Sequence, residues 1–289
     1  MAGVLHTLVE PGFFSDSAVQ LALVVGGVVA LVAAAVGVFT VLRGQAFAGD
    51  ALGHMGAAGG SSAYLIGLAP LWGFVAVALA AAGLMEMVGI QRARGRDLAT
   101  GIVLGAGLGL AALFLYLDTT HSGTAGATGT ILVGSIFTLD PAILPAALAL
   151  GAIALIIVIA LFRPLLLSSI SPELAVARGI PVRAVGILYL IAMAVAVALC
   201  AVTIGAILST ALLIGPGAAA LALTNRPGRA VALAGVIGLA ATWLGVLLAY
   251  DSYYWPPLHH GWPVSFFVVA LVLIAYLGAR AGGRRRVGG

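Results

Sequence analysis

Long apolar runs alternate with short polar connections along the whole chain. Each run is long enough to cross a hydrocarbon core about 30 Å thick as an α-helix. The pattern therefore predicts an all-α, polytopic membrane bundle of eight or nine helices, because only a tight turn separates the two runs that flank Cys200. The runs lie at roughly 18–42, 48–68, 71–90, 100–117, 142–162, 183–200, 202–223, 230–249 and 264–280.

Composition supports a membrane protein and leaves no room for a soluble domain. The 289 residues are 63% hydrophobic and 8% charged, whereas soluble domains average about 25% charged residues. We expect residues 1–289 to form a single transmembrane domain, so any energy source lies on a partner or in an ion gradient. Small residues let membrane helices approach closely, and Gly101, Gly105 and Gly109 predict a contact face on the fourth run.

The charged residues exclude some chemistry and predict an orientation. All 13 basic residues are Arg, so the chain has no lysine for a P-loop or for a Schiff base. With nine spans and an external N-terminus, every Arg falls in a cytoplasmic loop or in the C-terminal tail, as the positive-inside rule requires. The net charge of +4 is then a topology signal and does not indicate nucleic-acid binding. Because no basic region precedes the first run, we do not expect a cleaved signal peptide.

A carboxylate and an imidazole lie at membrane depth in the second run. Asp50 and His54 are four residues apart and share one helix face, which Ser61 continues. Together they form half of a site for zinc, manganese or iron, and two ligands suit transit better than storage. The alternative is that Asp50 caps the start of the helix and that His54 bonds to it.

A predicted cytoplasmic loop contains a sharply delimited short helix. Ser171 is a suitable N-cap, Pro172 suits the first helical position, and Gly179 suits a left-handed C-terminal residue. So short a helix does not hold alone in water, and it either docks on a partner or lies on lipid headgroups. Its residues are Pro172, Glu173, Leu174, Ala175, Val176, Ala177, Arg178 and Gly179.

The seventh run contains Gly215 and Pro216. Proline removes a backbone hydrogen bond, so we expect this helix to kink or break, either to line a transport pathway or as a plain packing kink. With Ser61, these residues are candidates for the pathway or its gate. Outside the membrane, His121, His259 and His260 are candidates for external metal capture, although histidines in loops usually have no specific role.

These segments, in this order, resemble the permease subunits of ABC importers for zinc, manganese and iron. GDALGH at 49–54 is similar to the family's GDALSH, and SPELAVARGIPVR at 171–183 to its cytoplasmic DPELARALGIPVR-like segment. LLIGPGAA at 212–219 looks like its LLITPAA, with Gly215 in place of Thr, and GSIFT at 134–138 is similar to its short outer segment. The residues after His54 depart from the family's usual run, which ends in Pro-Gly.

The resemblance implies a homodimeric permease of cobalamin-importer-like architecture in the cytoplasmic (inner) membrane of a bacterium. Two ATP-binding subunits would dock on the helix that begins at Pro172, and an extracytoplasmic metal-binding protein would deliver the ion. The permease is then no enzyme and holds no permanent cofactor: zinc, manganese or iron is its cargo, and ATP binds only the partner.

Other functions remain as alternatives. An intramembrane protease lacks support, since the chain has neither H-E-x-x-H nor G-x-S-x-G. An ion-coupled secondary metal carrier would need acids deep in the bundle, where only Asp50 and Glu86 qualify. A siderophore- or cobalamin-type permease shares the architecture but usually has a longer chain.

Overall fold

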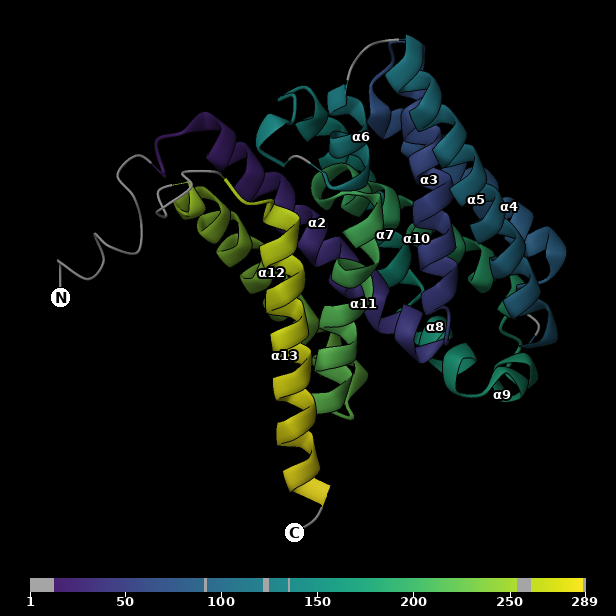
Figure 1. Ribbon diagram of the computed structural model, residues 1–289. Coiled ribbons are helices and arrows are strands. Elements are labelled where there is room, and N and C mark those ends of the chain that lie inside the picture. The colour runs from purple at the N-terminus through teal and green to yellow at the C-terminus, as the bar shows by residue number, and fades with distance from the viewer. Residues whose placement is uncertain (1–12, 91–92, 122–124, 135, 254–260, 288–289) are drawn as a thin grey trace, which may run out of the picture.

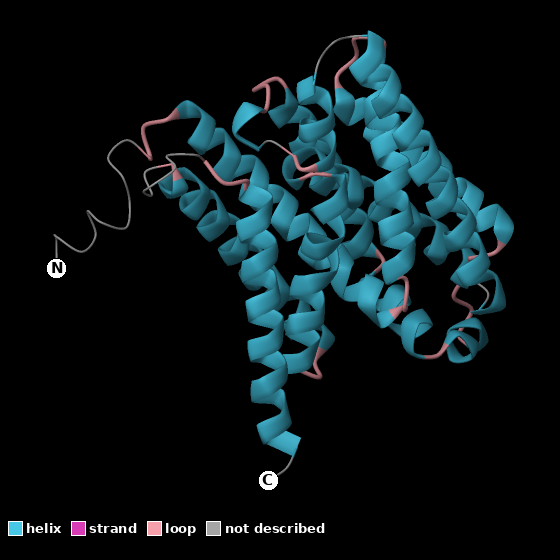
Figure 2. Ribbon diagram, in the orientation of Figure 1, coloured by secondary structure: helices cyan, strands magenta, loops and turns pink. Residues whose placement is uncertain are grey.

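The computed structural model describes residues 13–90, 93–121, 125–134, 136–253 and 261–287, and every regular element in these ranges is a helix (Figures 1 and 2). The predicted all-α bundle is therefore confirmed. The helices are α2 (Ser17–Leu42), α3 (Ala46–Leu65), α4 (Pro70–Val88), α5 (Ala93–His121), α6 (Ala125–Leu132), the 3-10 helix η1 (Ile136–Thr138), α7 (Ile143–Ala160), α8 (Phe162–Ile170), α9 (Pro172–Ala177), α10 (Val182–Ile204), α11 (Ala206–Leu223), α12 (Pro227–Ser252) and α13 (Val264–Val287).

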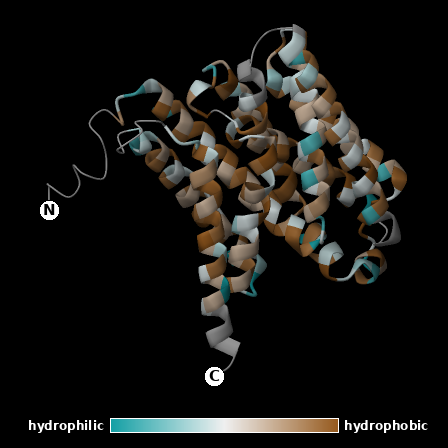
Figure 3. Cartoon of the chain, in the orientation of Figure 1, coloured by the Kyte–Doolittle hydropathy of each residue, from teal (hydrophilic) through white to brown (hydrophobic). Residues whose placement is uncertain are grey.

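Among the described residues, eight helices are long and apolar enough to cross a bilayer, and apolar residues dominate them in Figure 3. Helix α3 corresponds to the remaining apolar run of the sequence. Its 20 residues make it about 30 Å long, but Asp50, His54 and several glycines lower its hydropathy. The structure thus has a helix for each of the nine predicted runs, and the least apolar of them carries the candidate metal ligands.

Helices α2 and α10 form the centre of the bundle. They are the most buried of the candidate spans, and α10 packs against α2, α3, α4, α7 and α11. Close approach depends on glycine: the backbone of Gly37 in α2 lies directly against the Leu213 carbonyl of α11, so that an added Cβ would overlap the carbonyl oxygen. Contacts of this kind replace the hydrophobic effect as the source of packing energy between helices in lipid.

The turn between α10 and α11 is a single residue, Gly205, and it lies inside the bundle. Gly205 is buried and has a φ of 88°. Its backbone contacts the segment from Leu132 to Gly134, just after α6. A Cβ added at Gly53, near the middle of α3, would lie 3.7 Å from the Ala206 carbonyl oxygen at the start of α11. The tight turn predicted between these runs is confirmed, and the residues at the end of α6 and just after it pack against the turn.

The structure differs from the sequence prediction in three local features. Short helices α6, η1 and α8 occupy segments that the apolar pattern left as connections. Helix α11 continues through Pro216, so the break considered there is absent. A Cβ added at Gly101, Gly105 or Gly109 would meet no atom within 4 Å. The predicted contact face on α5 is therefore not used within the chain, and it is Gly107 that approaches α3, at His54 and Met55.

A polar cluster ties three helices together at the end of the bundle that carries α8 and α9 (Figure 1). The hydroxyls of Tyr189 in α10 and Thr40 in α2 are 2.6 Å apart, and Tyr189 also donates to the Val36 carbonyl at 3.1 Å. The Arg43 guanidinium lies 5.3 Å from the Tyr189 ring centroid and donates to Ser168 of α8. We call Thr40, Arg43, Ser168 and Tyr189 the Tyr189 cluster.

Candidate metal site on the third membrane helix

The glycines of the 49–54 segment bring α3 close to α10 and α11. A Cβ added at Gly49 would lie 2.9 Å from a methyl group of Leu213, and one added at Gly53 would lie 3.2 Å from the Ser209 hydroxyl. Asp50 and His54 each follow one of these glycines, and their side chains remain 32% and 17% exposed. Each glycine of the segment therefore packs against a neighbouring helix, and the residue that follows it, one helical position on, presents a polar side chain.

The structure places Asp50 and His54 one turn apart on the same face of α3. His54 Nε2 lies 3.9 Å from Asp50 Oδ1, which is too long for a hydrogen bond. The bond to Asp50 Oδ1 comes instead from the Thr210 hydroxyl of α11, at 2.8 Å. The capping interpretation does not hold, because Asp50 lies inside α3 and the N-cap position is occupied by Gln45.

This arrangement can supply one carboxylate oxygen and one imidazole nitrogen to a divalent cation. Late first-row metals accept imidazole, and the carboxylate also suits manganese and iron. Among the residues that the structure describes, no group of three or more His, Cys, Asp or Glu side chains could hold a metal ion. The pair is thus half of a coordination shell.

The three candidate pathway residues lie in different surroundings. Ser61 is fully buried, and its hydroxyl has no hydrogen-bond partner within the described part of the chain. The α3 face that is partly open at Asp50 and His54 is therefore covered at Ser61. Gly215 lies against Val272 of α13, and Pro216 lies next to Gly238 of α12.

The candidate histidines for external capture fall largely beyond what the structure describes. His121 is the last residue of α5, and its side chain is not among those described. His259 and His260 lie outside the described residues altogether.

The loop at 171–181 forms the helix that its caps predict. Ser171 accepts the Leu174 N–H at the N-terminus of α9, and Gly179 follows the helix with a φ of 76°. Ala175 is buried against the protein, whereas Leu174 and Val176 are 45% and 63% exposed. An apolar surface at this end of the bundle is left uncovered by the chain.

Two further acidic residues lie near the ends of membrane helices. Glu86 at the end of α4 pairs with Arg183 of α10 at 3.0 Å. Asp118, one residue beyond the predicted run at 100–117, lies within α5; it is buried, and neither carboxylate oxygen has a hydrogen-bond partner among the described residues.

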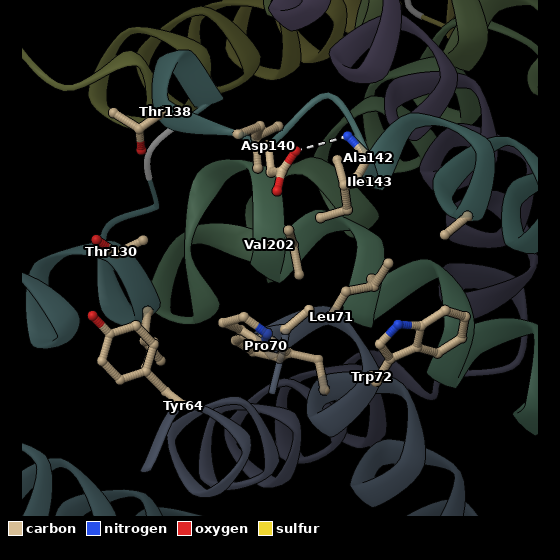
Figure 4. Close-up of a pocket in the computed structure, with 15 residues that line it drawn as sticks. Tyr64, Pro70, Leu71, Trp72, Thr130, Thr138, Asp140, Ala142, Ile143 and Val202 are labelled. Carbon is tan, nitrogen blue, oxygen red and sulfur yellow. Dashed lines mark hydrogen bonds between the residues drawn. The ribbon is translucent and has the colours of Figure 1, made fainter. Parts of the chain in front are cut away.

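A separate cavity of about 400 Å³ lies where the ends of α3 and α7 meet α4, α6 and η1 (Figure 4). Its walls are mainly apolar, with Leu71, Ile143 and Val202 among them. The charged residue in its lining, Asp140, accepts the Ala142 N–H at 2.9 Å and so caps the start of α7. None of the candidate metal ligands lines this cavity, which is therefore distinct from the Asp50–His54 site.

Comparison with known proteins agrees with this geometry. Residues 15–277 match the model of the ABC 3 transport family. The chain belongs to this family. It is 33% identical over 232 residues to a manganese transport system membrane protein of Halalkalibacterium halodurans, covering 80% of this chain and 78% of the relative. It is 28% identical to a probable iron transport system membrane protein of Haemophilus influenzae, with 86% of each chain covered.

A solved structure supports the same assignment. PsaBC from Streptococcus pneumoniae in complex with a Fab superposes on this ABC 3 family chain with a TM-score of 0.79 and 25% identity, covering 96% of this chain and 95% of the other. The chain is therefore an integral membrane permease of the ABC transporter class. It is a transporter subunit and not itself an enzyme, as expected from the resemblance in its motifs.

Thr210 is the site residue that sequence reasoning missed. The signal is present in the sequence, because Ser209 and Thr210 are polar residues within an apolar run. Polar groups at membrane depth deserve a functional hypothesis by default. Their partner was not readable, because Asp50 and Thr210 are 160 positions apart.

Proposed function

We propose that this chain is the permease subunit of an ATP-driven importer for a divalent transition metal, namely manganese, iron or zinc. The observation that carries the proposal is the pair of Asp50 and His54, partly exposed on one face of α3 and not hydrogen-bonded to each other. Relatives described as manganese and iron transport proteins support this class of cargo. The metal is a substrate in transit, so the protein needs no resident cofactor.

A homodimer would complete the coordination shell. One chain offers one carboxylate and one imidazole, and its described residues contain no third acidic, His or Cys ligand near them. Two copies that face each other across the exposed side of α3 would bring two such pairs to one pathway. Ser61 would continue that pathway along α3, and its buried position supports a closed segment there. Gly215 and Pro216 would act on it only through α11, because they pack against α13 and α12.

ATP hydrolysis would take place on two partner subunits. The absence of lysine excludes a P-loop on this chain. The exposed Leu174 and Val176 side chains support docking of an ATP-binding subunit on residues 172–179. On the other side of the bacterial cytoplasmic membrane, a metal-binding protein would deliver the ion, with His121, His259 and His260 as candidates for capture.

The site is tested by metal uptake in proteoliposomes that contain the complete importer. Asp50→Asn keeps the size of the side chain and removes its charge, and His54→Gln keeps polarity and removes the imidazole. We expect each to reduce ATP-dependent uptake at least tenfold, with assembly unchanged. Ser62→Ala is the matched control, because Ser62 bonds only to the Gly59 carbonyl of its own helix among the described contacts.

Undiminished uptake by the Asp50→Asn, His54→Gln double variant would remove the pair from the pathway. Uptake that follows an imposed ion gradient and needs no ATP would instead support the secondary carrier. Both measurements use the same vesicles.

The orientation is tested separately by cysteine labelling. Cys200 is buried and is the chain's one cysteine, so Cys200→Ala gives a cysteine-free background. In it, an impermeant reagent applied to intact cells should modify Tyr253→Cys and leave Ile170→Cys unmodified; both positions are exposed, at 57% and 71%. Labelling at position 170 alone would reverse the proposed topology. Ser168 is a poorer position, because it is buried and bonded to Arg43.

A further inference from the structure

We propose that Thr210 is a positioning residue that keeps Asp50 and His54 apart and available for the cation. The inference rests on the proposed function, since it assigns a role within the same site. Its basis is that the bond to Asp50 Oδ1 comes from α11 and not from the neighbouring histidine on α3.

An aspartate and a histidine at i and i+4 on a helix are close enough to bond to each other. Here the Nε2–Oδ1 separation is 3.9 Å, so a small rotation of either side chain would close it to a hydrogen bond. A bonded pair would satisfy both groups internally, and an arriving cation would have to break that bond first. The Thr210 hydroxyl, 2.8 Å from Oδ1, donates to the same carboxylate oxygen that faces His54 Nε2.

The packing of α11 against α3 brings the Thr210 hydroxyl to Asp50. Threonine in a helix has two common χ1 rotamers, one of which bonds to its own helix; here the hydroxyl bonds to Asp50 instead, and the preceding residue of α11 lies against Gly53 of α3. The preceding hydroxyl, that of Ser209, serves a different purpose: it donates to the Ala206 carbonyl of its own helix at 2.8 Å. The Ser209 hydroxyl therefore bonds within α11, whereas the Thr210 hydroxyl bonds to Asp50, so Ser209 is the control for Thr210.

The test is manganese uptake by the complete importer in proteoliposomes, with KM and maximal rate measured separately. Thr210→Val keeps the branched shape and removes the hydroxyl. We expect its KM for Mn²⁺ to rise roughly tenfold, the scale of losing a hydrogen bond to a charged group, with maximal rate and assembly unchanged. Thr210→Ser and Ser209→Ala should both keep the wild-type KM. Thr210→Ala removes the hydroxyl with less bulk and should repeat the valine result.

An unchanged KM in both Thr210→Val and Thr210→Ala would overturn the proposal. A fall in assembly or maximal rate without a change in KM would also overturn it, because that result assigns Thr210 to packing. The Asp50→Asn, His54→Gln double variant, measured in parallel, separates this failure from failure of the proposed function. If the double variant loses uptake and the Thr210 variants behave as wild type, the site stands and only the positioning role fails.

Discussion

The Asp50–His54 site and the Tyr189 cluster are both polar, but they differ in burial and in how the side chains of each are bonded to one another. In the cluster, Tyr189 is fully buried, its hydroxyl contacts two partners, and a guanidinium covers its ring. At the site, Asp50 and His54 are partly exposed, and their mutual distance is too long for a bond.

The difference separates stabilising from functional polar groups in a membrane bundle. A buried polar group that is fully bonded rigidifies the helices that it joins. A group left with spare bonding capacity contributes little to stability but can accept a ligand. The α9 helix shows a comparable division between apolar side chains, because Ala175 packs against the protein while Leu174 is left exposed for a partner to cover.

The largest expected effect comes from adding charge to the exposed side of α9. Leu174→Asp, or Glu173→Arg, should leave the isolated permease folded and prevent assembly with the ATP-binding subunit, since an unpaired charge buried on docking costs about 3–5 kcal/mol. Co-purification of the two subunits measures it. Ile66→Asp, at a position 72% exposed away from α9, should assemble normally. Normal assembly and transport by the α9 variants would show that this helix is not the contact.

An intermediate effect is expected within the Tyr189 cluster, on stability and not on transport. Tyr189→Phe removes the hydroxyl that joins α2 to α10, and losing this buried bond should cost about 1–3 kcal/mol. Thermal unfolding of the purified permease in detergent measures the loss, while uptake per assembled complex should stay near wild type. Tyr116→Phe is the control, because Tyr116 is 66% exposed. A loss of uptake in Tyr189→Phe without a loss of stability would contradict the proposal that the Tyr189 cluster stabilises the bundle while the Asp50–His54 site serves transport.

The smallest effect is expected at the pair of Glu86 and Arg183. It is bonded at 3.0 Å; the Glu86 side chain is 12% exposed, but the Arg183 side chain is 79% exposed, so solvent screens the pair from one side, and exposed pairs contribute about 0.2–1 kcal/mol. Glu86→Gln should therefore lower unfolding stability by less than Tyr189→Phe does, in the same assay. A loss of stability larger than that of Tyr189→Phe would contradict this prediction and show that the Glu86–Arg183 pair stabilises the fold as strongly as the Tyr189 cluster does.

The sequence predicted the elements that depend on local physics. Apolar run length located the nine long helices, and the caps of α9 followed from Ser171, Pro172 and Gly179. The shared face of Asp50 and His54 followed from helical periodicity alone.

What the sequence did not predict depends on contacts between distant segments. The apolar run predicted at 100–117 ends before the polar residues at 118–121, but α5 continues through them to His121. Three glycines at helical spacing on α5 suggested a contact, yet Gly107 makes it, because the position of α3 decides which side of α5 is approached. The bond between Thr210 and Asp50 joins α11 to α3, and no local sequence pattern specifies how far one helix is shifted along the other.

The single-residue turn at Gly205 has a consequence for how the gene tolerates change. Its φ of 88° and the backbone of Leu132–Gly134 packed against it leave no space for any side chain and none for an inserted residue. Irregular backbone within a membrane bundle is tolerated only where protein or a water-filled cavity surrounds it, so lengthening this connection would displace the segment from Leu132 to Gly134 that packs against it. In a library of random in-frame insertions screened for transport, no active variant should carry an insertion within codons 204–206. Most short connections between helices, in contrast, are places where insertions are tolerated.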